Sequence, residues 1–174
     1  VTAKRLQTGG VGDNTSLGRG LVRISGGALT FSEHILLARN VRCESVLTLD
    51  GGSITHTNGN ELSLARQGGR SEINVSGGTF NNANMNTIFQ PTTGYGPGTG
   101  IVNLCAGALI TAPLQNPNSS PATLNFSGGT LASSGDSTAF VPANMAGVYT
   151  FGAFGAFAGG AFIDSNGKNI TIPA

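Results

Sequence analysis

The stretch Thr123–Leu131, TLNFSGGTL, combines two patterns that decide the fold. Apolar Leu124 and Phe126 flank polar Asn125, which is the two-residue period of a β-strand with one buried face. A pair of glycines then interrupts the run. Glycine accepts backbone angles that other residues avoid and leaves room for a close neighbouring segment, so we expect the strand to turn a corner there.

Nearly the same phrase occurs six times in the 174 residues. The last glycines of the six phrases, called the corner glycines below, are Gly27, Gly52, Gly78, Gly107, Gly129 and Gly160. They are 25, 26, 29, 22 and 31 residues apart. A sequence period of about 20–50 residues indicates a solenoid, propeller or array, and a propeller blade needs about 40–50 residues for its four strands. The shorter intervals therefore favour a solenoid.

Apolar residues occupy three fixed positions around these corners, five and three residues before the corner glycine and two after it. They are Val22, Leu47, Ile73, Val102 and Leu124; Ile24, Leu49, Val75, Leu104, Phe126 and Phe157; and Leu29, Ile54, Phe80, Leu109, Leu131 and Phe162. Stacked rungs would place each apolar residue on its equivalent in the next rung, at a spacing of about 4.8 Å. The sequence predicts one all-β domain over residues 1–174, a solenoid of about six rungs, with 1–20 as an irregular segment or incomplete first rung.

The segments between the strands contain turn-forming residues. We expect protruding loops at residues 90–100 and 112–121, a turn at 164–167 and a last strand at 168–173. A mostly polar column separates the apolar columns before the corner. Its members are Arg23, Thr48, Asn74, Asn103 and Asn125.

Composition restricts the class of protein. Glycine accounts for 28 residues, and charged residues for 10% against about 25% in ordinary soluble domains. The net charge of +1 gives no broad attraction for nucleic acid or acidic membranes, and no apolar run has the length of a membrane span. No charged residue occurs from Ile73 to Gly135. We expect that surface to be covered by another molecule or to be unusually polar and neutral.

The segments TLNFSGGTLASSGDSTAF (123–140) and VYTFGAFGAFAGGAFIDSNGKNITI (148–172) resemble the autotransporter-associated β-strand repeat, also called the passenger-associated transport repeat. The likeness is best over residues 122–173. This family comprises large secreted and surface-displayed bacterial proteins. The resemblance implies a right-handed parallel β-helix, an extracellular or cell-surface location and passage through a secretion system. It supplies no shared catalytic residues.

Polysaccharide-cleaving enzymes also use right-handed β-helices, and they need several carboxylates or bases on one face. Asp50 stands in a column without a second acid, whose other members are Ser25, Ser76, Cys105, Ser127 and Ala158. The acids Asp13, Asp136 and Asp164 fall in turn contexts. Arg42 and Arg66 follow their corner glycines at similar distances, which fits a basic strip for an acidic glycan. Ordinary surface pairing with Glu44, Glu61 and Glu72 is the favoured interpretation.

No cofactor or metal site is predicted. His34 and His56 are isolated in the sequence, and Gly9–Asn14, GGVGDN, matches the calcium-binding nonapeptide pattern only once. Cys43 and Cys105 belong to different rungs, two or more apart, which exceeds the Cα spacing of a disulfide. We predict that they are not bonded to each other within one chain, and a bond between subunits stays open.

Two functions are consistent with these features of the sequence. The favoured one is a non-enzymatic extracellular structural protein, a subunit of a surface filament or matrix fibre. Ile170, Ile172 and Pro173 would form its assembly surface toward other copies of the chain, joined head to tail. The alternative is a glycan-binding or glycan-cleaving passenger domain that contacts surface glycans.

Overall fold

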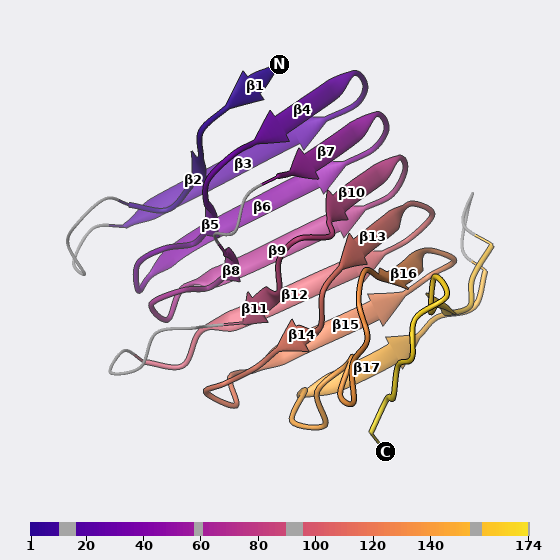
Figure 1. Cartoon of the computed structure of the whole chain (residues 1–174). Helices are drawn as coiled ribbons and strands as arrows, with labels where there is room; N and C mark the ends of the chain where they lie inside the picture. Colours follow the sequence, from indigo (N-terminus) through magenta and orange to yellow (C-terminus); the bar gives the residue numbers. More distant parts are fainter. Residues whose placement is uncertain (11–16, 58–60, 90–95, 154–157, 174) are drawn as a thin grey trace.

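Strands and glycine corners wind into a right-handed parallel β-helix of about five turns (Figure 1). The structure is a computed structural model that describes residues 1–10, 17–57, 61–89, 96–153 and 158–173. Every strand pair in it is parallel, and the described residues contain no helix. Accordingly, the described part of the chain offers no helix with the length and apolarity to traverse a lipid bilayer.

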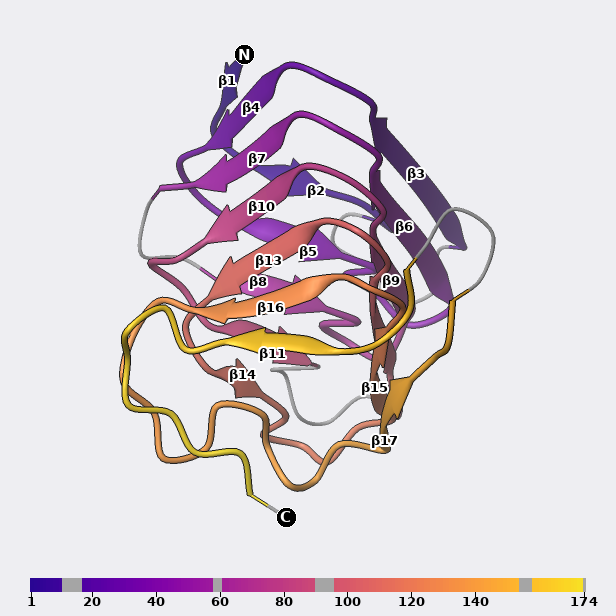
Figure 2. The same ribbon diagram turned by 90° about the vertical axis from the view of Figure 1, so that its right-hand side faces the viewer.

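Each full turn contributes one strand to each of three sheets, which form the three walls seen in Figure 2. The first wall, sheet C, contains β3 (Gly18–Ile24), β6 (Cys43–Leu49), β9 (Arg70–Val75), β12 (Thr99–Leu104), β15 (Ala122–Phe126) and β17 (Gly147–Thr150). The second wall, sheet A, contains β1 (Thr2–Ala3), β4 (Ala28–Phe31), β7 (Ser53–His56), β10 (Thr79–Asn82), β13 (Ala108–Thr111), β16 (Thr130–Ser133) and β18 (Phe162–Asp164). The third wall, sheet B, contains β2 (Leu6–Gln7), β5 (Ile35–Leu37), β8 (Leu62–Leu64), β11 (Thr87–Phe89) and β14 (Leu114–Gln115).

The predicted apolar columns form the core in the second to fifth rungs, and Val22, Ile24 and Leu29 of the first rung are partly buried against it. In sheet C, Leu47, Ile73, Val102 and Leu124 are aligned rung by rung, and all four are completely buried. In sheet A, Ile54, Phe80, Leu109 and Leu131 are aligned in the same way and are equally buried. Parallel pairing without a register shift therefore stacks each apolar residue on its equivalent in the next turn.

Sheet B was not expected from the sequence. Its strands have only two or three residues, which is too short for a two-residue period to be recognised. One of them, β14, lies inside the segment 112–121 that was predicted to be a loop, so that prediction is wrong for Leu114–Gln115. Residues 90–95 of the other predicted loop lie outside the described residues.

Residues 1–10 form part of a rung, and residues 11–16 of the predicted N-terminal segment lie outside the described residues. Strand β1 pairs with β4, and β2 pairs with β5, so each extends a sheet at its N-terminal edge. The first strand of sheet C, β3, then begins at Gly18.

The sixth repeat departs from the prediction. Ile163, not Phe162, is aligned with Leu131, while Phe162 is aligned with Thr130. In sheet C the last strand is β17, which places Val148 opposite Leu124, and Phe157 lies outside the described residues. The core residue of β18 thus follows its corner glycine by three residues instead of two, which the spacing in the other repeats could not reveal.

The predicted last strand at residues 168–173 is also absent. Only a single bridge, between Ser137 and Ile170, continues the third wall there. Phe140, whose N–H donates to the Thr171 carbonyl at 2.8 Å, is buried and fills the core at this end. The last rung is thus only partly closed, which accounts for about five turns in place of six rungs.

Candidate functional site

The corner glycines are brought together as a stack along the edge between sheets C and A. The carbonyls of the first five corner glycines each accept a hydrogen bond from the first residue of the sheet A strand in the next rung, for example Ser53 N–H to Gly27 O at 2.8 Å. Gly78 shows why the residue type matters. Its φ of +70° lies in the left-handed region, and a Cβ added there would lie 2.2 Å from Gly52 O. These glycines are therefore structural and bring rungs into close contact.

The fifth corner solves the same problem differently. In the fifth phrase the first glycine of the pair, Gly128, has positive φ (+99°), and Gly129 does not. A Cβ on Gly129 would still lie 2.5 Å from the Leu104 carbonyl carbon. Close approach of the backbones is thus the constraint common to Gly78 and Gly129.

A column of buried polar side chains lies where the strands of sheet A end. His56 Nδ1 lies 2.8 Å from Asn82 Oδ1, and Asn82 Nδ2 donates to the Met85 carbonyl at 3.1 Å. Thr87 Oγ1 and Thr111 Oγ1 are 3.0 Å apart. Buried polar groups that satisfy one another in this way hold a corner in place. Within the described residues, no three His, Cys, Asp or Glu side chains gather closely enough to hold a metal ion.

The other histidine, His34, lies close to charged residues, directly before strand β5 of sheet B. Its Nδ1 is buried without a hydrogen-bond partner among the described residues. Burial lowers the pKa of His34, and the positive charges of Arg66 and Arg5 lower it further. The imidazole is therefore kept neutral at physiological pH.

The acidic residues do not converge into a catalytic cluster in the described part of the chain. Asp50 accepts a hydrogen bond from Ser76 Oγ at 2.7 Å and forms an ion pair with Arg23. These two contacts, the serine hydrogen bond first, lower the pKa of Asp50. Asp136 and Asp164 each accept a backbone N–H at a turn, and Asp13 lies outside the described residues.

The two arginines considered for a basic strip, Arg42 and Arg66, differ in their ion pairs. Arg66 is ion-paired with Glu61, as the surface-pairing interpretation predicted, and burial lowers the pKa of its guanidinium. Among the described residues Arg42 has no acidic partner within ion-pair distance, and Glu44 pairs with Arg19 instead. The two arginines therefore have different surroundings.

The two cysteines lie where a disulfide cannot join them. Cys43 begins β6 and Cys105 follows β12, so β9 lies between their rungs, and neither thiol is in a disulfide. The prediction that they are not bonded to each other is confirmed. Burial raises the pKa of the Cys105 thiol.

The last rung exposes apolar side chains that its predecessors bury. Val148, Ile163 and Ile172 are 50%, 40% and 45% exposed. Together with Phe126 and Pro173 they line an open hollow of about 220 Å³ at the end of the core. Of the three residues predicted as an assembly surface, Ile172 and Pro173 belong to this apolar end, whereas Ile170 packs partly against the core.

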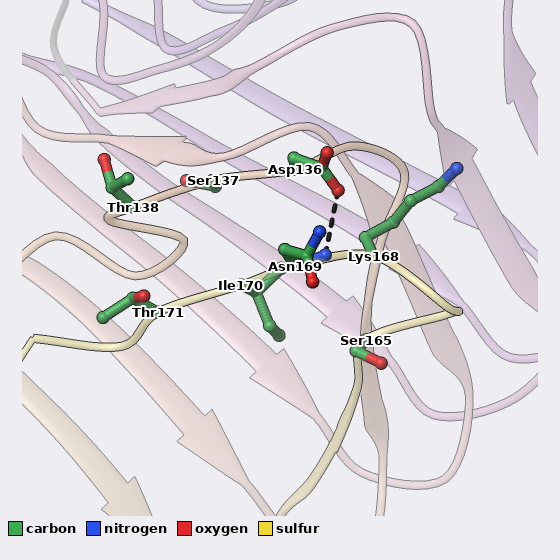
Figure 3. A pocket seen from close by; sticks show the side chains of 8 residues that line it. All are labelled: Asp136, Ser137, Thr138, Ser165, Lys168, Asn169, Ile170 and Thr171. Atoms are coloured by element: carbon green, nitrogen blue, oxygen red, sulfur yellow. Dashed lines mark hydrogen bonds between the residues drawn. The ribbon is translucent and has the colours of Figure 1, made fainter.

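A larger, polar hollow of about 770 Å³ lies beside this end (Figure 3). Asp136 and Ser137 line it from one segment, and Lys168, Asn169 and Thr171 line it from the neighbouring one. Asp136 Oδ1 accepts the Asn169 N–H at 2.8 Å, the contact drawn in Figure 3. This carboxylate thus ties the two segments together and has no acidic partner for general acid–base chemistry.

Comparison with known proteins gives no relative: no family model, no curated protein and no solved structure matches this chain.

Proposed function

We propose that this protein is a non-enzymatic structural protein of the cell exterior, a subunit that joins other copies head to tail into a filament or fibre. The observation that carries the proposal is the apolar last rung. Val148 and Ile163 continue buried columns of the core, yet about half of each is exposed. A following rung would cover them, and the first rung of a second copy offers one.

The two ends of the coil fit each other in strand polarity. All strands in a sheet are parallel, so the free edge of β17 runs in the same direction as the free edge of β3. A contact between unlike ends does not close on itself and therefore propagates into a filament.

The dispersed carboxylates favour a structural protein over a polysaccharide-cleaving enzyme. Cleavage by paired carboxylates needs two groups a few ångströms apart on one face, and Asp50, Asp136 and Asp164 each serve a separate structural contact. The extracellular location is proposed from the resemblance to the passenger-associated repeat.

The test is electron microscopy and light scattering of the purified 174-residue chain over a range of concentrations. We expect filaments whose abundance rises with concentration. Ile163→Lys should abolish them because it places a charge in the apolar end. Ile101→Lys, which changes an outward-facing residue of β12 in mid-coil, is the matched control and should still form filaments.

A monodisperse monomer at high concentration would contradict the proposal. So would filaments that Ile163→Lys leaves intact while circular dichroism shows the variant folded.

A further inference from the structure

A second feature of the last rungs lies on the outer face of sheet C, away from the apolar end. A hollow of about 550 Å³ opens over strands β9, β12 and β15, bounded on one side by the segment after β17. Its volume is within the range of about 300–1,000 Å³ typical of small-molecule sites. None of the described residues that line it is charged.

Three asparagines form the polar wall of this hollow. Asn74, Asn103 and Asn125 are aligned on adjacent strands. Asn103 Nδ2 donates to Asn74 Oδ1 at 2.6 Å, and Asn125 Nδ2 donates to Asn103 Oδ1 at 2.7 Å. Asn103 Nδ2 also donates to Glu72 Oε1 at 3.1 Å. This ladder fixes the side chains, and its contacts use one N–H of Asn125, so that residue keeps a carboxamide oxygen and a second N–H for a ligand.

The opposite wall is apolar and anchored by the backbone. The Phe151 side chain lines the hollow and is about half exposed. Its N–H donates to the Phe126 carbonyl at 2.8 Å, and its carbonyl accepts the Gly160 N–H at 2.9 Å. A Cβ on Gly159 would lie 2.4 Å from the Ala153 nitrogen, so the last glycine pair is what lets this segment lie so close. The wall is therefore preformed.

The chemistry of the walls restricts the class of ligand that the hollow can bind. Amide groups and the Ser127 hydroxyl offer hydrogen bonds without charge, and the Cys105 thiol nearby stays protonated because burial raises its pKa. An anionic ligand would find no counter-charge. An extended peptide would find no main-chain partners, because the strand N–H and C=O groups beneath are already paired within sheet C.

We propose that this hollow binds an uncharged carbohydrate chain. A sugar ring presents hydroxyls at its rim and an apolar C–H face, which match the asparagine ladder and the Phe151 ring. Because the amides recur once per rung along the coil axis, successive sugar units can be held in a row. The site holds its ligand without cleaving it, since no carboxylate lines the hollow.

The test is isothermal calorimetry of the 174-residue chain with a panel of hexasaccharides. The neutral members are glucan, mannan, xylan and N-acetylglucosamine oligomers, and the acidic member is oligogalacturonate. We expect binding of at least one neutral oligomer and none of the acidic one. Asn125→Ala and Phe151→Ala should each weaken binding about tenfold, the loss of one net hydrogen bond or stacking contact. Thr123→Ala, on the same strand but outside the hollow, should bind as the parent does.

Absence of binding to every neutral oligomer at millimolar concentration overturns the proposal. It is equally overturned by tighter binding of oligogalacturonate, or by binding that both Asn125→Ala and Phe151→Ala leave unchanged. The outcome is independent of filament formation, because Ile163→Lys leaves the hollow intact and should bind the oligomer with the parent affinity.

Discussion

Val102 and Val148 are two valines that occupy the same column of sheet C, two rungs apart. Val102 is completely buried, and Val148 is 50% exposed. The first corner differs from a middle one in the same way: a Cβ on Gly78 would lie 2.2 Å from Gly52 O in the preceding rung, whereas one on Gly27 would meet nothing within 4 Å. The middle and the ends of the coil therefore share a sequence pattern but differ in whether a neighbouring rung covers them.

This difference shows that burial in a solenoid is supplied by neighbouring turns. A rung has an apolar side chain in the right place through its local pattern, but it loses contact with water only when rungs lie on both sides. The apolar end and the proposed assembly surface follow from that arrangement. Three predictions compare the middle with the end of the coil.

The largest effect is expected at the corners. Gly78→Ala adds a Cβ that would lie 2.2 Å from Gly52 O, in addition to the strain of positive φ. We expect a loss of about 2–5 kcal/mol in the free energy of unfolding, measured by urea denaturation. Gly27→Ala and Gly160→Ala, with positive φ and free space, should cost only about 1–2 kcal/mol. Equal costs at all three positions would show that strain, not close approach, selects glycine.

An intermediate effect is expected from shortening the two valines. Val102→Ala removes two buried methyl groups and leaves a cavity, so it should cost about 2–3 kcal/mol. Val148→Ala should cost less than about 1 kcal/mol in the monomer, because half of the side chain is already exposed. If the two variants unfold at the same urea concentration, the end rung is more covered in solution than the structure shows.

The smallest effect concerns Asp50 on the surface of the second rung. Hydrogen bonds from Ser76 and Arg23 lower its pKa in the folded state from the ordinary value of 3.8. A lowered pKa contributes stability that is present above pH 3.8 and is lost as the pH falls through the lower folded value. Ser76→Ala should raise the pKa of Asp50 in an NMR titration and reduce this acid dependence.

The matched control for this titration is Ser127→Ala, which changes the same outward position two rungs further along. It should leave the titration of Asp50 unchanged. A pKa that does not move in Ser76→Ala would mean that Arg23 alone stabilises the carboxylate.

Much of the fold was predictable because its signals are local. Leu124, Asn125 and Phe126 alternate within one strand, and Gly128 and Gly129 mark the corner directly after it. The hollow on sheet C was predictable only in part. The polar column of Asn74, Asn103 and Asn125 was visible, but its apolar wall at Phe151 was not, since that wall depends on a segment returning across the sheet.

The sequence by itself determined the repeat, the alternating columns and the glycine corners, because each depends on residues within one turn of chain. Only the tertiary structure decided the third wall, where strands as short as Ile35–Leu37 exist by pairing with equally short neighbours. It also decided that Ile163, not Phe162, continues the core column. Such short strands and shifted registers are stabilised by contacts between turns, and those contacts come into being only when the coil has closed.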